Sequence, residues 1–333
     1  MARKVLEVRD LRTSFFTHLG EVKAVDGVSF DVEEGEVIAI VGESGCGKSV
    51  TAMSIMGLVA EPGRITGGSI QFDGQELVTM REREKVRIRG SQIGMVVQDP
   101  MTSLNPVLTV GAQIMETLIW HQGLSKQAAR QRAGEMLQLV GIPSPEKRLD
   151  QYPHQFSGGM RQRAMIAIAL ACNPKLLIAD EPTTALDVTI QAQIMDLLRD
   201  LKRQLGTSVI LITHDLGVVA GMAQRVVVMY GGKVVEEGAV RDIYHNPQHP
   251  YTWGLLRSIP RLGTGRRQRL IPIDGQPPDL LHPPAGCGFT DRCEYAMEVC
   301  RDLPPEHLGV GPGHQARCWL LHPSAPRVER AGA

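Results

Sequence analysis

Five short apolar runs, each bounded by polar or turn-forming residues, are typical of strands buried on both faces. They cover residues 37–41, 93–97, 175–179, 208–213 and 225–230. In residues 4–10 and 24–32, apolar and polar positions alternate instead, which predicts half-buried strands. Phe15 and Phe16 fall between these two segments, where we expect a loop.

Other segments place apolar residues at helical spacing. An amphipathic helix is predicted over 187–205, and a short exposed helix over the highly charged segment 79–90. A longer region between two buried runs predicts helices over 110–122, 126–140 and 146–151. The mixture of buried strands and helices predicts an α/β fold, with a helical subdomain at about 99–170.

The composition changes near residue 259, where Pro, Gly and Arg become frequent and periodicity weakens. We therefore expect a main domain of residues 1–258 and a small cysteine-rich C-terminal extension of residues 259–333. No apolar run is long enough to span a bilayer, and the first residues lack the apolar stretch of a signal peptide. A cytoplasmic protein that reaches a membrane only through its partners is expected.

A glycine-rich loop joins the buried run 37–41 to a predicted helix at 51–58. It has two glycines five residues apart followed by Lys and Ser, the pattern of a phosphate-binding loop. Backbone N–H groups and the helix N-terminus bind phosphate oxygens, Lys48 reaches the β- and γ-phosphates, and Ser49 binds Mg²⁺. The residues predicted to bind a nucleoside triphosphate are Gly42, Glu43, Ser44, Gly45, Cys46, Gly47, Lys48, Ser49 and Val50.

Polar residues also follow two of the other buried runs. Asp180 and Glu181 follow the run 175–179, where the first can hold Mg²⁺ through water and the second can act as general base. His214 follows the run 208–213 and can reach the γ-phosphate at the strand edge where α/β ligands gather, a structural role being its alternative.

A second glycine-containing helix start lies at Ser157, Gly158 and Gly159. It is a candidate anion site by the same dipole argument, and simple capping of the helix by Ser157 is the alternative. One triphosphate does not need two such sites, which suggests that one of them serves a nucleotide bound to a second subunit. Phe15 or Phe16 can stack on adenine, or either can be an ordinary packed side chain.

Charge and cysteine content narrow the picture further. Lys plus Arg and Asp plus Glu both total 36, and this zero net charge argues against a nucleic-acid partner.

The C-terminal extension contains four cysteines. Disulfides between them are not expected in a reducing cytoplasm, so a metal centre is preferred over four separate buried thiols. The spacing of the four cysteines matches neither the usual zinc-binding pattern nor the cysteine pattern of ferredoxins. The cysteines concerned are Cys287, Cys293, Cys300 and Cys318.

Taken together, these motifs resemble the nucleotide-binding subunits of ABC transporters over residues 4–258. The loop 42–49 corresponds to that family's Walker A motif, Ser157–Gln162 to its signature, and Leu176–Asp180 to its Walker B strand. The resemblance makes Glu181 the catalytic carboxylate, His214 the switch histidine, and Gln98 the Q-loop residue that contacts Mg²⁺ and the γ-phosphate. Phe156 stands where the family usually has Leu, a change that concerns packing only.

The resemblance implies an ABC-type P-loop NTPase with an antiparallel β subdomain and a helical subdomain, using ATP and Mg²⁺. Two ATPase subunits would pack head to tail, each nucleotide lying between the Walker A loop of one and the signature of the other. A groove beside Gln98 would receive a helix of the membrane permease.

Residues 98–106 and 246–252 resemble more narrowly the dipeptide/oligopeptide importer ATPases, in particular the D-type. This implies ATP-driven peptide import with a second, non-identical ATPase, two permease subunits and an extracytoplasmic binding protein, at the cytoplasmic face of the cell membrane. Cargo such as a nickel chelate or haem, or a soluble non-transport ATPase, are the alternatives. The C-terminal extension resembles an importer segment associated with a [4Fe–4S] cluster, with Zn²⁺ as the alternative.

Overall fold

The computed structural model describes residues 3–184, 186–259 and 272–328. The chain divides into two compact units. The first unit comprises Met1–Val5, Val32–Glu36 and Thr79–Ile212, and the second comprises Leu6–Asp31, Val37–Val78 and Thr213–Ala333. Residues 260–271, which follow the predicted boundary near 259, lie outside the described ranges.

The first unit is built on parallel strands. β6 (Ile93–Val96) pairs with β7 (Leu176–Asp180), and β7 pairs with β8 (Ser208–Thr213). Every residue of β7 and β8 is buried, as expected for parallel strands whose sequences are apolar throughout. These bounds confirm three of the five predicted buried strands to within two residues at each end.

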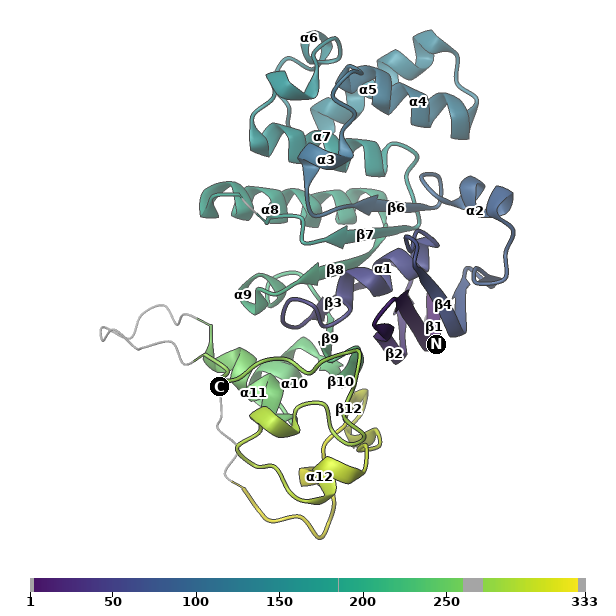
Figure 1. The fold of residues 1–333 in the computed structure, drawn as a ribbon. Helices are drawn as coiled ribbons and strands as arrows, with labels where there is room; N and C mark the ends of the chain where they lie inside the picture. The colour runs from purple at the N-terminus through teal and green to yellow at the C-terminus, as the bar shows by residue number, and fades with distance from the viewer. Residues whose placement is uncertain (1–2, 185, 260–271, 329–333) are drawn as a thin grey trace, which may run out of the picture. The chain divides into compact units, whose positions relative to one another are not determined.

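Helices make up most of the rest of the first unit, and those predicted over 110–122 and 126–140 are found within one residue of these bounds. Their bounds are α2 (Glu82–Ile88), α3 (Pro100–Ser103), α4 (Val110–Gln122), α5 (Lys126–Leu139), α6 (Pro145–Arg148), α7 (Gly158–Leu170) and α8 (Val188–Leu205), with a 3₁₀ turn at Pro153–Gln155. Helices α7 and α8 run side by side, and α4, α5 and α6 lie beyond α7 (Figure 1).

The second unit contains a mixed sheet. β3 (Val37–Val41) is parallel to β9 (Arg225–Tyr230), which is antiparallel to β10 (Lys233–Ala239). The short strands β12 (His314–Ala316) and β11 (Leu308–Gly311) extend the sheet beyond β10. The C-terminal segment thus joins the sheet. Its strands of three and four residues are too short to show periodicity in the sequence.

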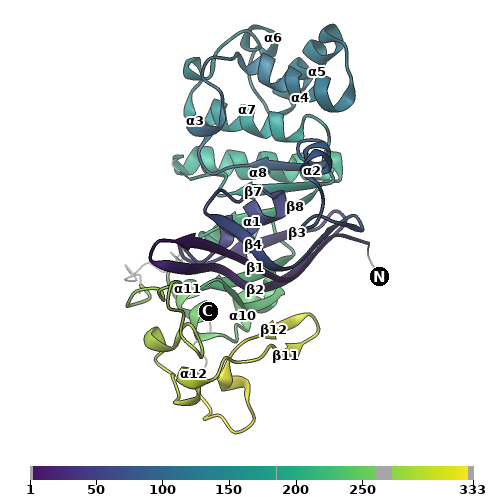
Figure 2. The same ribbon diagram turned by 45° about the vertical axis from the view of Figure 1, so that its right-hand side comes forward.

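A four-stranded antiparallel sheet completes the second unit, in the order β2-β1-β4-β5 (Figure 2). The strands are β1 (Lys4–Thr17), β2 (Gly20–Glu33), β4 (Gly63–Phe72) and β5 (Gln75–Glu76). The prediction of a loop at Phe15 and Phe16 was wrong, because β1 continues to Thr17 and pairs Phe15 with Gly63. Register shifts around Arg12 interrupt the alternation on which that prediction relied.

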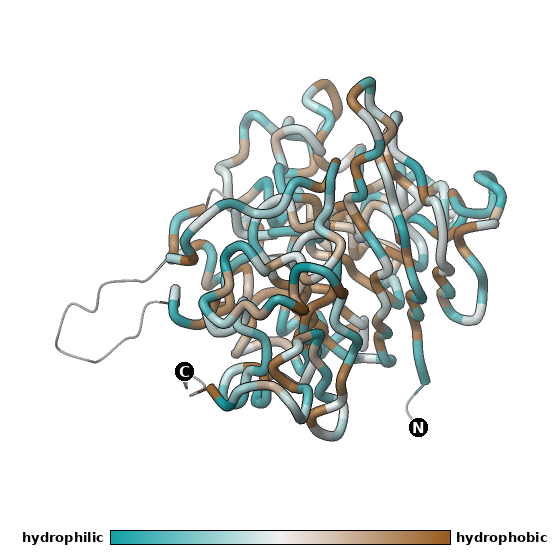
Figure 3. The backbone as a smooth tube through the Cα atoms, turned by 60° about the horizontal axis from the view of Figure 1, so that its bottom comes forward, coloured by the Kyte–Doolittle hydropathy of each residue, from teal (hydrophilic) through white to brown (hydrophobic). Residues whose placement is uncertain are grey.

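Short helices accompany these sheets: α1 (Lys48–Met56), α9 (Leu216–Val219), α10 (Val240–His245), α11 (Pro250–Arg257) and α12 (Val299–Asp302), with 3₁₀ turns at Thr290–Arg292 and Trp319–Leu321. The core of the second unit gathers Val41, Val228, Tyr230, Tyr251 and Phe289, and in Figure 3 hydrophilic segments lie mainly on outer loops. None of the helices in the described ranges combines the length and apolar character required to cross a membrane.

Candidate nucleotide-binding and hydrolysis site

The phosphate loop connects the fully buried strand β3 to helix α1 in the second unit. Gly42 has φ 154° and Gly47 has φ 99°. A Cβ atom at Gly42 would lie 2.2 Å from the backbone oxygen of Met229, and one at Gly47 would lie 2.4 Å from that of Ala24. Only glycine fits these two positions, so the backbone curls tightly, as an anion cradle requires.

Lys48 begins helix α1 and is almost fully buried, with 5% of its surface exposed. Its Nζ donates hydrogen bonds to the backbone oxygens of Gly42 (2.8 Å) and Glu43 (2.9 Å). The ammonium group is therefore held inside the loop by the residues that would surround a phosphate. No acidic residue occupies the first turn of α1, so the positive end of the helix dipole stays available to an anion.

The first unit brings Gln98 and Glu181 together, as the sequence predicts. Gln98 Nε2 donates a hydrogen bond to Glu181 Oε2 at 2.9 Å, and Thr184 Oγ1 donates to the same oxygen at 2.8 Å. Glu181 has φ 45°, a left-handed conformation that is uncommon outside glycine and concentrates at functional sites. Asp180 precedes it at the end of β7, with 3% of its surface exposed.

Sequence reasoning missed Thr184. It lies three residues after Glu181, outside the sequence motifs named above. Its hydroxyl and the Gln98 amide both donate to Oε2 of Glu181, so Gln98 and Thr184 together orient the carboxylate of the proposed general base.

Ser157 is the N-cap of α7, and its Oγ accepts a hydrogen bond from the backbone N–H of Met160 at 3.3 Å. The capping role is thereby confirmed. Gly158 and Gly159 form the first turn, which carries no acidic side chain. A Cβ at Gly159 would lie 2.9 Å from the Ile190 side chain, so α7 and α8 approach closely here. The exposed helix start remains a candidate anion site.

The remaining predicted residues lie in the second unit. His214 is exposed just after β8. Phe15 packs its ring against Gly63, where a Cβ would come within 2.6 Å of it. Phe16 is 38% exposed, and the guanidinium carbon of Arg64 lies 4.1 Å from its ring centroid. Each unit therefore carries a distinct part of the predicted site.

The four C-terminal cysteines are free thiols. Burial raises the pKa of Cys318 to about 12. Burial likewise raises the pKa of Cys293 to about 11. Across the described ranges, however, no group of three or more His, Cys, Asp or Glu side chains is placed to hold a metal ion. The predicted metal centre therefore receives no support from ligand geometry.

Comparisons with known proteins agree with this geometry. A family model described as ABC transporter matches residues 25–184, and one described as the C-terminal region of oligopeptide/dipeptide transporters matches residues 235–300. A solved dimeric ATP-binding cassette in a post-hydrolysis state, bound to ADP and phosphate, is 31% identical with a TM-score of 0.64. It covers 71% of this chain and 99% of its own. The fold and the site define an ABC-type ATPase.

Curated relatives narrow the family. The oligopeptide transport ATP-binding protein OppD of Bacillus subtilis is 56% identical over 98% of this chain and 91% of its own length. The dipeptide transport ATP-binding protein DppD of Lactococcus lactis is 53% identical over 98% of this chain and 93% of its own. The chain belongs to the family of oligopeptide and dipeptide ABC transporter ATP-binding proteins.

Proposed function

We propose that this chain hydrolyses ATP to drive import of short peptides through a membrane permease, as a peripheral subunit at the cytoplasmic face of the cell membrane. The observation that carries the hydrolytic part is the hydrogen bond from Gln98 to Glu181 at the end of β7. The names of the peptide-transport relatives support the cargo class. Cargo of another kind, such as a nickel chelate or haem, remains the competing reading.

The residues divide the work of hydrolysis. The loop Gly42–Ser49 and the following Val50 hold the triphosphate. Ser49 and Gln98 would supply oxygen ligands for Mg²⁺ and Asp180 would hold it through water, and the ion would neutralise phosphate charge. Glu181 accepts a proton from the attacking water. His214 contacts the γ-phosphate. We assign adenine stacking to Phe16 because it is the more exposed of the two candidate rings.

Substitution of Glu181 by Gln tests the hydrolytic assignment. Loss of a general base lowers turnover by about 10²–10⁴-fold, while ATP binding to the phosphate loop should persist. The matched control is Glu34→Gln, which removes a carboxylate from an exposed turn. Near-normal hydrolysis by the Glu181→Gln protein would overturn the role of this carboxylate.

Partners follow from the same family assignment. We propose a second, non-identical ATPase, two permease subunits that bind near Gln98, and an extracytoplasmic peptide-binding protein reached through them. Affinity purification of the chain from detergent-solubilised membranes should recover both permeases and the second ATPase. Recovery of the chain only in a soluble complex without permeases would favour a non-transport ATPase instead.

We further propose that Cys287, Cys293, Cys300 and Cys318 mark a family-specific C-terminal extension and take up a [4Fe–4S] cluster. The occurrence of four free thiols within the short segment 287–318 supports this proposal. The raised pKa values keep free thiols protonated, so cluster binding would release protons. Anaerobically purified protein should contain iron and acid-labile sulfide, lost in Cys300→Ser. Stoichiometric zinc without sulfide would contradict the proposal.

A further inference from the structure

The C-terminal segment contacts the phosphate loop directly, through Arg292 and Glu43. The two guanidinium nitrogens Nη1 and Nη2 donate to the two carboxylate oxygens of Glu43, at 2.6 Å and 2.9 Å. Only 3% of the Arg292 side chain is exposed. A bidentate pair of this kind is among the stronger polar contacts in proteins, and it fixes direction as well as distance.

Glu43 is in turn held at its backbone. Its N–H donates to the Tyr251 hydroxyl at 2.8 Å, and its backbone oxygen accepts the 2.9 Å hydrogen bond from Lys48 Nζ. The residue clamped by the C-terminal segment is therefore the same residue that positions the phosphate-binding lysine. The clamped carboxylate and the carbonyl that accepts from Lys48 thus belong to one residue.

Arg292 is anchored on its other side by the segment itself. Its Nε donates to the backbone oxygen of Asp274 and its Nη2 to that of Ile273, both at 2.9 Å. Nη1 also reaches the Tyr230 hydroxyl at 3.1 Å. Together with the two Glu43 oxygens, these groups make five acceptor atoms on four residues, which hold the guanidinium in one orientation.

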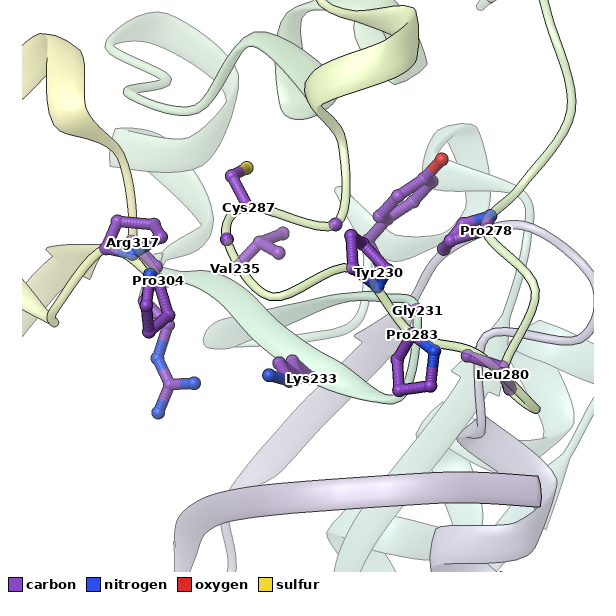
Figure 4. A pocket seen from close by; sticks show the side chains of 14 residues that line it. Tyr230, Gly231, Lys233, Val235, Pro278, Leu280, Pro283, Cys287, Pro304 and Arg317 are labelled. Atoms are coloured by element: carbon purple, nitrogen blue, oxygen red, sulfur yellow. The ribbon is translucent and has the colours of Figure 1, made fainter. Parts of the chain in front are cut away.

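Aromatic packing joins the same segment to the sheet. The Phe289 ring lies edge-on to Tyr230 with centroids 5.2 Å apart, and its centroid is 5.4 Å from that of Tyr251. Nearby, prolines of the segment, including Pro278 and Pro283, line a pocket with Tyr230 and Lys233 of the β9–β10 hairpin, and Cys287 lies beside it (Figure 4). The segment that contains the cysteines and Arg292 therefore packs on strands β9 and β10, and Arg292 contacts Tyr230 at the end of β9.

We propose that Arg292 is a positioning residue for ATP binding: the C-terminal segment braces the phosphate loop through the Arg292–Glu43 pair and so sets the placement of Lys48. The proposal rests on the ATP-binding part of the proposed function and does not require the iron–sulfur cluster. It gives the C-terminal segment a role in nucleotide affinity. Disturbing that segment near Arg292 therefore changes ATP binding without altering any residue of the loop.

The test is a double-mutant cycle in the full-length protein with a fluorescent ATP analogue. Arg292→Ala and Glu43→Gln should each weaken binding by roughly tenfold, as expected when a reactive group is misplaced. The double variant should be no weaker than either single variant, because both remove the same contact. Arg292→Lys keeps the positive charge but cannot form the bidentate pair, so its ATP affinity should lie between those of wild type and Arg292→Ala. The matched control, Arg301→Ala, removes an exposed arginine of the same segment and should bind as wild type does.

The assembled transporter supplies a second readout. Arg292→Ala should raise the KM for ATP by a similar factor, with a smaller change in kcat, since the carboxylate and glutamine of hydrolysis are intact. If Arg292→Ala fails to fold, Glu43→Gln and Arg292→Lys carry the same test. Unchanged affinity in folded variants, or additive losses in the double variant, would overturn the brace. Absence of ATP binding by the wild-type chain would instead refute the proposed function.

Discussion

At the scale of single residues, backbone geometry dictates the phosphate loop more strictly than side-chain chemistry does. The Cβ of an alanine at Gly42 would stand 2.2 Å from the backbone oxygen of Met229. Gly42→Ala should therefore shift the loop and weaken ATP binding by about tenfold or more, measured by equilibrium titration. Gly35→Ala is the control: its φ of 71° is also positive, but no atom lies within 4 Å of the added Cβ.

The control should lose about 1–2 kcal/mol of folding stability from its left-handed backbone, with ATP affinity unchanged. Equal losses of affinity in both variants would show that strain, and not the clash with Met229, controls the loop.

A buried histidine makes the folding stability of the second unit depend on pH. Burial lowers the pKa of His249 to about 4, although the nearby Glu236 carboxylate acts in the opposite direction. Its Nδ1 accepts the backbone N–H of Tyr251 at 3.1 Å. The unfolded chain, with a histidine pKa near 6.5, takes up the proton first. The free energy of unfolding is therefore unaffected above pH 6.5 and falls as the pH drops toward 4.

At pH 5 this protonation of the unfolded chain lowers the free energy of unfolding by about 2 kcal/mol. His249→Asn keeps an acceptor for Tyr251 and cannot be protonated, so urea unfolding should show a smaller loss of stability between pH 7.5 and pH 5 than in wild type. His18→Asn, at an exposed position, should behave as wild type. An identical pH dependence in all three proteins would contradict the buried neutral histidine.

Whether the sequence could predict a functional residue or contact depends on how far apart the residues involved lie along the chain. Lys48 and Glu181 follow local patterns, a glycine loop and the end of a buried strand, so the sequence alone names both as candidates. The contact between Arg292 and Glu43 joins residues 249 positions apart, and neither partner's neighbours indicate it. Only the fold brings that pair together.

At the scale of secondary structure elements, two helices offer a matched comparison of capping and function. Ser157 caps α7 and Ser125 caps α5, each accepting a backbone N–H at 3.3 Å. Ser157→Ala and Ser125→Ala should each cost about 1 kcal/mol of stability in chemical unfolding. Only Ser157→Ala should also lower ATPase activity of the assembled complex. Equal ATPase activities of the two variants would show that Ser157 only caps its helix.

Element prediction succeeded where a segment is long or uniformly apolar. The strands β8 and β9 were placed at their observed bounds, 208–213 and 225–230. Failure came where a strand is irregular or very short. β1 contains register shifts that break its alternation, and β11 and β12 pair only through contacts with a sheet formed by distant residues.

At the scale of the whole molecule, the two candidate anion sites bear on whether this chain shares its nucleotides with a second ATPase. The phosphate loop lies in the second unit and the Ser157 helix start in the first, and one triphosphate does not need two helix N-termini. If each nucleotide is completed by the other ATPase, Lys48 and Ser157 of this chain serve different nucleotides.

Photolabelling with an azido-ATP separates these roles when this chain carries an affinity tag that distinguishes it from the second ATPase on a gel. In the assembled complex, Lys48→Ala should abolish labelling of this chain and leave its partner ATPase labelled. If the helix start of α7 serves the nucleotide of the partner ATPase, Ser157→Ala should lower trapping of nucleotide on the partner ATPase and leave this chain labelled. Ser125→Ala should change neither. Loss of labelling on this chain alone in Ser157→Ala would place both anion sites on one nucleotide and contradict the head-to-tail arrangement.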